Sequence, residues 1–265
     1  GIEREHRAGQ RAHDARPARG GGRRRHLALS LSGEEPVAPR RLHPAGGVKT
    51  SWVQAATERA TSGPLPGTEV EKVSGTPFDA FLERRIFAPL GMVDTGFTVP
   101  VAKLSRLAAN YRLTPEGLVL IESGRNSVYA RPPAFPYGGA GLVSSARDYS
   151  RFMAMLLAEG QLGRTRILKT ETARTMMSDL MEPGVAATTA TGESGYGAGG
   201  RSVIAATPGG EGIGTYGWSG AAGTHAFVDR EHGLYTVLMT QFMAPPTNPL
   251  YAEFGRALYA DLARA

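Results

Sequence analysis

The chain has 265 residues, enough for one large domain or two small ones with a substantial buried core. It contains no cysteine, which excludes disulfides, thiolate metal sites and a cysteine nucleophile, and leaves hydroxyl, carboxylate and imidazole chemistry. No stretch approaches the roughly 18 consecutive apolar residues of a membrane-spanning helix, and the first residues lack the apolar segment of a signal peptide. We therefore expect no membrane partner and, by default, a cytoplasmic location.

The net charge of +6 arises entirely in the first fifty residues, where ten arginines and Lys49 exceed the acidic residues by six. This segment (1–50) has no aromatic residue and no helical or strand periodicity, so we expect it to be disordered. A nucleic-acid-binding arm around residues 20–25 is an alternative, although a solvated tail is the more usual meaning of such a charge run. A third hypothesis, which we favour, is a segment read out of frame from a GC-rich gene.

Ordinary globular sequence follows and makes up a second region, residues 51–265, which we expect to be a partial domain. Phe78, Phe81, Leu82 and Ile86 recur at helical spacing and predict an amphipathic helix over 77–87, ended by the Ala-Pro-Leu-Gly string after it. The next predicted elements are a short helix within 101–111, a strand at 117–121 and a Pro/Gly loop at 131–141.

The second half predicts two helices, then strands, then a last helix. Ser145 is a plausible N-cap of a helix ended by Gly160, and residues 169–181 predict another. Strands are predicted at 195–205, 216–229 and 234–241, the last two joined by a turn at 230–233 as an antiparallel meander. Asn248 is the predicted cap of a final helix whose apolar positions are Leu250, Phe254, Leu258 and Leu262.

Three strings together point to one family. They are residues 71–78 running on to 86–97, residues 137–145 followed by 148–152, and residues 216–225 followed by 227–229. In this order they resemble the serine β-lactamase and penicillin-binding-protein superfamily, especially class C β-lactamases and family VIII esterases. The resemblance covers roughly residues 64–265. It implies an α+β fold, an antiparallel β-sheet flanked by helices, which is incomplete in this chain.

The third string is the one that bears on function. The first two consist of glycine and proline punctuation and identify the fold. In the family the Trp-x-Gly string lies on the strand that lines the active-site cleft, and the resemblance implies that the N–H of Ala221 is an oxyanion-hole donor. The implied substrate-binding residues are Tyr216, Trp218, Ser219, Gly220 and Ala221.

The residues that perform the family's acyl transfer are missing from this chain. That reaction uses Ser-x-x-Lys on one helix face and Tyr-x-Asn or Tyr-x-Ser. The four lysines have Gly46, Glu69, Pro100 and Arg166 three places before them, and no tyrosine has Asn or Ser two places after it. We therefore expect no catalytic residue and no turnover.

Without the central helix that bears Ser-x-x-Lys, we also expect apolar surface on one face of the sheet, with instability or aggregation as its consequence. The intact relative would hydrolyse small esters or related acyl compounds. The alternative is a binding protein that uses the retained cleft for an acyl or peptide ligand. The oligomeric state is left open.

Two other groups of residues could carry chemistry in this chain. Ser219 lies in a Gly-Trp-Ser-Gly-Ala string that superficially resembles a nucleophile elbow, with His225, Asp229 and His232 as hypothetical partners. A strand-like run follows instead of a helix, and alternation along the strand should separate Ser219 from a productive histidine. His225, Glu231 and His232 lack the spacing of metal ligands, and no nucleotide-binding motif is present, so no metal and no cofactor are expected.

Overall fold

The computed structural model describes residues 47–50, 67–184, 187–189, 192–206, 210–243 and 249–264. Predictions about the basic segment, apart from 47–50, and about Asn248 lie outside these residues. No helix in the described part is long and apolar enough to cross a membrane.

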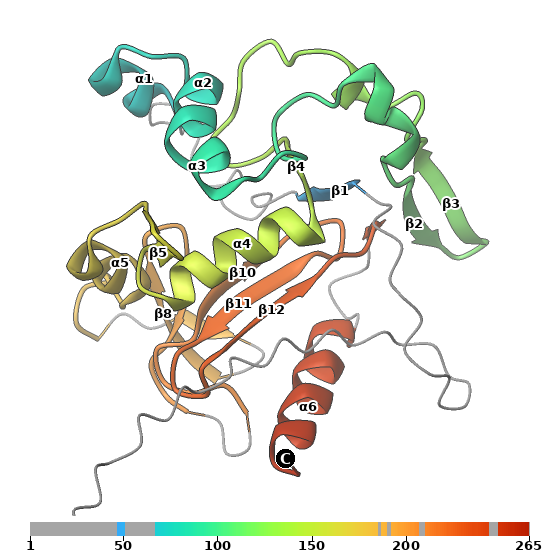
Figure 1. Cartoon of the computed structure of the whole chain (residues 1–265). Coiled ribbons are helices and arrows are strands. Elements are labelled where there is room, and N and C mark those ends of the chain that lie inside the picture. The colour runs from blue at the N-terminus through green and yellow to red at the C-terminus, as the bar shows by residue number, and fades with distance from the viewer. Residues whose placement is uncertain are drawn as a thin grey trace, which may run out of the picture.

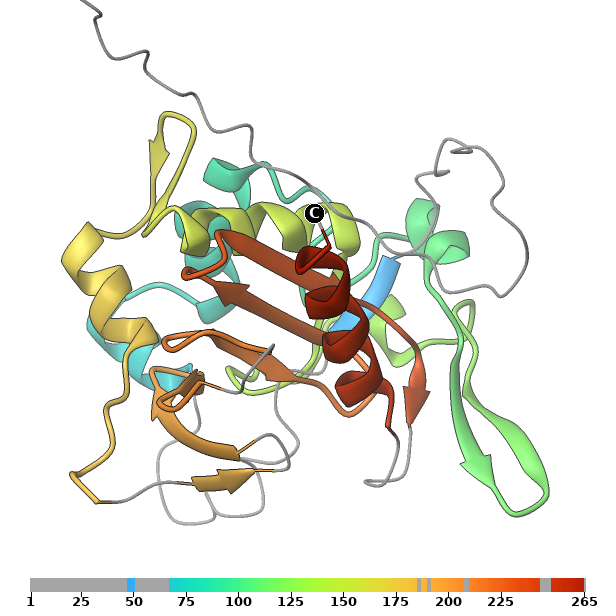
Figure 2. The same cartoon turned by 90° about the horizontal axis from the view of Figure 1, so that it is seen from below.

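The centre of the fold is a six-stranded antiparallel sheet in the order β12-β11-β10-β9-β8-β7. Helix α4 (Ala146–Leu157) lies across one face of this sheet and α6 (Leu250–Leu262) across the other (Figures 1 and 2). The strands are β7 (Ala187–Thr189), β8 (Gly192–Gly197), β9 (Gly200–Val203), β10 (Tyr216–Ser219), β11 (His225–Asp229) and β12 (Leu234–Leu238). The expected α+β class with a flanked antiparallel sheet is confirmed.

Two predicted strands were wrong in extent, because each is a hairpin of two strands. The stretch 195–205 turns at Gly199, which has φ 81°, and contains β9 and part of β8. The stretch 216–229 is divided into β10 and β11 by a turn in which the N–H of Gly220 donates to the carbonyl of Thr224 at 2.7 Å. Small residues fill both turns, and they do not interrupt the apolar pattern that strand prediction follows.

The N-terminal helical region lies on the α4 side of the sheet (Figure 1). Its elements are α1 (Thr68–Ser74), α2 (Phe78–Leu82), the π-helical turn η1 (Glu83–Phe87) and α3 (Ala88–Leu90). The predicted helix over 77–87 is present, and it runs on through Pro89 to end at Gly91, which adopts the left-handed conformation at φ 65°.

A hairpin projects from the opposite end of the molecule (Figure 1). It is formed by β2 (Asn110–Thr114) and β3 (Gly117–Glu122), and β13 (Phe242–Met243) pairs with β2 in parallel. The other short elements are η2 (Val101–Arg106), η3 (Val128–Ala130), β1 (Gly47–Thr50) paired with β4 (Leu142–Ser145), and β5 (Gln161–Leu162) paired with β6 (Thr165–Arg166). The predicted strand at 117–121, short helix within 101–111 and irregular 131–141 loop are thus confirmed.

Helix α4 forms as predicted. The hydroxyl of Ser145 accepts a hydrogen bond from the N–H of Asp148 at 3.2 Å, which is the N-cap arrangement. Its apolar face places Tyr149, Met153 and Leu156 in the main core, together with residues of β10 and β11. Helix α4 therefore couples the sheet to the helical region.

The other two helices differ from prediction at their ends. Helix α5 (Thr170–Met177) stops four residues before 181, because Ser178 is extended and the N–H of Leu180 donates to the carbonyl of Tyr196 instead. Helix α6 has Pro249 at its N-cap. Phe254 and Leu258 are buried as predicted against Phe227, whereas Leu262 is exposed.

The large exposed apolar side chains of the described residues are not where we expected them. Helix α4 lies over one face of the six-stranded sheet and α6 over the β10–β12 part of the other, and the largest group of exposed apolar residues lies on the β2–β3 hairpin instead. This group is Tyr111, Leu113, Leu118, Val119, Leu120 and Ile121. The expectation of a bare sheet face was therefore wrong for this part of the chain, although a cavity remains between the sheet and the helices.

Replacement of Ser145 by alanine should lower the free energy of unfolding by about 1 kcal/mol, since the N–H of Asp148 loses its cap. Ser150→Ala, in the middle of the same helix, is the matched control and should be neutral or slightly stabilising. Urea unfolding followed by circular dichroism measures both; equal effects would show that Ser145 has no capping role.

Candidate functional site

Strand β10 carries the residues that sequence reasoning placed at the cleft, and it divides them between two faces. Tyr216 packs in the core with Tyr149 of α4, and Trp218 also faces α4, where it and Tyr149 line one small cavity. Ser219 points the other way, toward α6, because successive side chains of a strand alternate. The five predicted binding residues therefore do not share one surface.

A cavity of about 320 Å³ lies between β10, α4 and the helices of the N-terminal region. Its walls are formed by apolar side chains such as Phe78, Leu82, Ile86 and Phe152, and by Tyr216 and Gly217 of β10. Within the part of the chain that the structure describes, no charged residue, serine or lysine lines it. Its size falls at the lower end of the range usual for small-molecule pockets, about 300–1,000 Å³.

Trp218 lies beside this cavity, at a much smaller one of about 10 Å³. Its ring meets that of Tyr196 edge to face, with centroids 5.3 Å apart. Tyr149 lines both cavities. From the sequence we predicted Tyr149 only as a core residue of the helix. Its position directly after Asp148 in the second family string was the sequence signal for a place at the cavities.

The backbone next to Trp218 is closely packed. A Cβ atom on Gly217 would lie 2.2 Å from the carbonyl oxygen of Ala226, so the position admits no side chain. Ala221, whose N–H the resemblance implies as an oxyanion donor, is half-buried in the turn after β10, and it lines neither of the two cavities beside this strand.

Ser219 and His225 form a pair that we did not expect. The Ser219 hydroxyl and His225 Nδ1 are 2.8 Å apart, because the two residues are directly opposite in the β10–β11 register and so share a face. The argument that alternation would separate them was wrong: it applies along one strand, and not between neighbouring strands. The pair nevertheless faces α6, where the His225 ring stacks on Tyr251 at 4.9 Å.

The imidazole of His225 is a weak base. Burial, and to a lesser extent the nearby Arg201 cation, lowers the pKa of His225 to about 4. The ring is therefore neutral at pH 7, and its hydrogen bond to Ser219 is one between uncharged groups.

Asp229 does not complete a triad with this pair, because it serves the other histidine. Its fully buried carboxylate accepts from the Tyr259 hydroxyl at 2.7 Å and the N–H of Gly212 at 3.1 Å, and it pairs with His232 Nδ1 at 2.8 Å. Burial opposes ionisation, but these hydrogen bonds outweigh it and keep the pKa of Asp229 lowered. The cluster ties the β11–β12 turn to α6.

Glu231, the third residue weighed as a metal ligand, accepts the N–H of Ile213. Among the described residues no group of three His, Asp or Glu side chains is placed to hold a metal ion.

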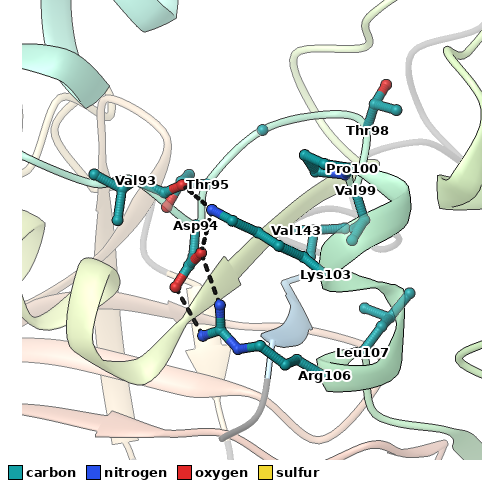
Figure 3. Close-up of a pocket in the computed structure, with 11 residues that line it drawn as sticks. Val93, Asp94, Thr95, Thr98, Val99, Pro100, Lys103, Arg106, Leu107 and Val143 are labelled. Atoms are coloured by element: carbon teal, nitrogen blue, oxygen red, sulfur yellow. Dashed lines mark hydrogen bonds and ion pairs between the residues drawn. The ribbon is translucent and has the colours of Figure 1, made fainter. Parts of the chain in front are cut away.

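A third cavity, of about 120 Å³, contains an ion-pair cluster of three side chains (Figure 3). The carboxylate of Asp94 accepts hydrogen bonds from the guanidinium of Arg106 on both oxygens, at 3.0 and 2.8 Å, and one from Lys103 Nζ at 2.6 Å. These hydrogen bonds, that from Arg106 foremost, lower the pKa of Asp94 to about 2. The N–H of Asp94 in turn donates to the buried carboxylate of Asp148, so the cluster fastens the loop after α3 onto α4.

Lowering the pH should protonate the carboxylate of Asp94 and weaken its ion pairs with Arg106 and Lys103. Since the folded pKa of Asp94 is below its ordinary value of 3.8, its contribution is complete above pH 4 and is lost as the pH falls toward about 2. Asp94→Asn should lower the free energy of unfolding at pH 7 by up to about 2 kcal/mol and flatten this acid limb. Melting temperatures from pH 5 to 2 test it, with Asp261→Asn of the exposed Arg264 pair as control; an unchanged limb would contradict it.

Protonation of His225 should destabilise the fold. The pKa of His225 is about 4 in the folded chain and 6.5 ordinarily, so the unfolded chain takes up the proton first as the pH falls. The stabilising contribution of the neutral ring to folding is therefore complete above pH 6.5 and is lost as the pH falls from 6.5 to 4. Nuclear magnetic resonance should show the His225 ring titrating near pH 4. A midpoint near 6.5 would mean that the ring is not buried as described.

Comparison with known proteins identifies the family of this chain. The family model described as Beta-lactamase matches residues 59–261. Protein Rv1367c of Mycobacterium tuberculosis is 31% identical over 185 residues, 66% of this chain and 46% of that protein. Esterase EstB of Burkholderia gladioli is 31% identical over 215 residues, 73% of this chain and 52% of the esterase.

Among solved structures, simvastatin synthase of Aspergillus terreus superposes with a TM-score of 0.63 at 22% identity, covering 74% of this chain and 53% of that enzyme. This likeness shows the fold. The chain spans about half the length of the curated relatives that it matches. From the family match and the shared fold, the chain belongs to the beta-lactamase family.

Proposed function

We propose that this chain provides the substrate-binding wall of a β-lactamase-related serine hydrolase of the esterase type, and that by itself it does not catalyse hydrolysis. The observation that carries the proposal is the composition of the two cavities beside β10. Among the described residues, no serine, lysine or carboxylate lines either cavity, although the Trp218 strand forms part of both; His225 and Thr224 line the smaller one. Acyl transfer needs a nucleophile and a base within hydrogen-bond reach of each other and of the substrate.

The three lysines whose side chains the structure describes support the absence of a base. Lys103 is held by Asp94 and by the carbonyl of Val93 at 2.8 Å, in a different cavity. Lys72 on α1 and Lys169 at the start of α5 are exposed. None is placed to take a proton from a serine at the Trp218 strand.

The Ser219–His225 pair is the alternative catalytic arrangement, and three observations argue against it. The pair faces α6 and does not line the large cavity, although His225 also lines the small one, and His225 is a weak base because of its lowered pKa. Asp229, the nearby carboxylate, is committed to His232 and Tyr259. A triad needs that carboxylate on the histidine that serves the nucleophile.

Binding without turnover is the second candidate function, and the 320 Å³ cavity favours it. In this view the chain holds an acyl compound at the wall that includes Tyr216 and Trp218. An isolated ligand-binding role would appear as ligand-dependent stabilisation in the absence of hydrolysis.

The test is hydrolysis of p-nitrophenyl butyrate and nitrocefin by the purified chain and by Ser219→Ala. We expect neither protein to exceed the rate in buffer, because no described serine, lysine or carboxylate lines either cavity. Turnover that Ser219→Ala abolishes would establish Ser219 as a nucleophile and overturn the proposal. Turnover that survives this substitution, and that co-purifies with the chain, would overturn it through a different residue.

A further inference from the structure

The β2–β3 hairpin extends away from the six-stranded sheet and exposes one uncharged apolar face (Figures 1 and 2). Tyr111 lies opposite Leu120 in the strand register and Leu113 lies opposite Leu118, so each pair shares a face of the hairpin. These four side chains are from 40% to 66% exposed. None of them belongs to a core cluster of the described residues, so the packing of the domain does not explain this apolar surface.

Strand β3 is also an open edge. The three-stranded sheet has the order β13-β2-β3, so β2 pairs on both sides, and no described strand pairs with the outer side of β3. An edge strand presents N–H and carbonyl groups that can pair with another strand, and natural proteins commonly protect such edges with lysine or proline. Strand β3 contains neither, and its residues 118–121 are all apolar.

The acidic residues at the ends of β3 do not prevent pairing with an identical strand. Glu122 is half-buried, and its carboxylate accepts hydrogen bonds from the Ser127 hydroxyl and, at 3.1 Å, from the N–H of Val128. Glu116 lies in the turn, outside the strand. Two antiparallel strands of the same sequence are related by a two-fold axis, so an uncharged apolar edge fits a second copy of itself.

A lipid bilayer is the other partner that an apolar hairpin suits, and the charges of the hairpin argue against it. Glu116 is exposed at the tip, and hydrogen bonds, that from the Thr114 hydroxyl foremost, lower its pKa, so it is ionised at pH 7. Arg112 is exposed on the face of the hairpin that it shares with Val119. Insertion would carry both charges toward the hydrocarbon, which is costly.

We propose that two copies of this chain associate through β3, whose outer edges pair in antiparallel orientation and join the two three-stranded sheets into one. Leu118 and Leu120 of one copy then pack beside β3 of the other. The contact is small, because β2 has five residues and β3 six, whereas a standard interface has about 20–30 residues on each side. The dimer is therefore weak, and its population increases with the concentration of the chain.

Sedimentation velocity over a wide range of concentration tests the proposal, together with hydrogen exchange read by mass spectrometry. The average mass should rise from that of one chain toward that of two, and peptides that cover Gly117–Glu122 should exchange more slowly at high concentration. A monomer at every concentration, or a dimer in which exchange of β3 is unaltered, would overturn the proposal.

Lysine substitutions show whether β3 is the contact. Val119→Lys places a charge on the pairing edge and should weaken dimerisation about tenfold or more. Val73→Lys, the same change at a 90% exposed position of α1, is the matched control and should leave dimerisation unchanged. Thermal melts establish that the variants fold, and Leu118→Lys replaces Val119→Lys if the latter does not. Undiminished dimerisation of a folded β3 variant would contradict the proposal.

Sedimentation with phosphatidylcholine vesicles tests the membrane alternative, and we expect the chain to remain in the supernatant. Binding to vesicles that the β3 lysine variant abolishes, without a dimer in solution, would replace the proposal with a lipid partner. Neither experiment depends on hydrolysis, because β3 lines neither of the two cavities beside β10.

Discussion

The packing of α4 against the six-stranded sheet is the constraint on which the remaining structure depends. Its apolar face closes the main core over β11 and β12, and its first turn holds the helical region in place. There the buried carboxylate of Asp148 accepts the N–H of Asp94 and the hydroxyl of Thr95, while Asp94 gathers Lys103 and Arg106. Tyr149, the next residue, then stands at the wall between the two cavities. One helix thus joins the core, the ion-pair cluster and the candidate site.

The functional conclusion follows from the two faces of β10. Among the described residues, the large cavity on the α4 face is lined by apolar side chains and by no serine, lysine or carboxylate, whereas the α6 face has a serine, two histidines and a buried aspartate. The Ser219–His225 pair and the large cavity therefore lie on opposite sides of β10. The polar groups of the α6 face satisfy one another across Ser219–His225 and Asp229–His232–Tyr259, which is the behaviour of groups that hold a helix on a sheet.

Sequence reasoning recovered the elements whose signals are local. The periodicity after Phe78, the Ser145 cap, the strand from Gly117 and the apolar positions of α6 each depend on neighbours within a few residues, and the structure has them. The prediction failed where strand pairing determines the structure. Two stretches predicted as single strands are hairpins, because the small residues of their turns at Gly199 and Gly223 do not interrupt the apolar pattern. It also failed at Ser219 and His225, since the distance between residues on adjacent strands is set by register and not by spacing along the chain. The cavity could not be predicted, because α2, α4 and β10 come together only in three dimensions.

The chain thus belongs to the beta-lactamase family and spans about half the length of its curated relatives, and we propose for it binding without chemistry. The most direct measurement of that claim is the intact mass of the purified chain after incubation with a fluorophosphonate, which labels activated serines covalently. The account predicts an unchanged mass. A stoichiometric adduct on a single serine, lost on heat denaturation before labelling, would contradict it and would reveal a nucleophile within the chain.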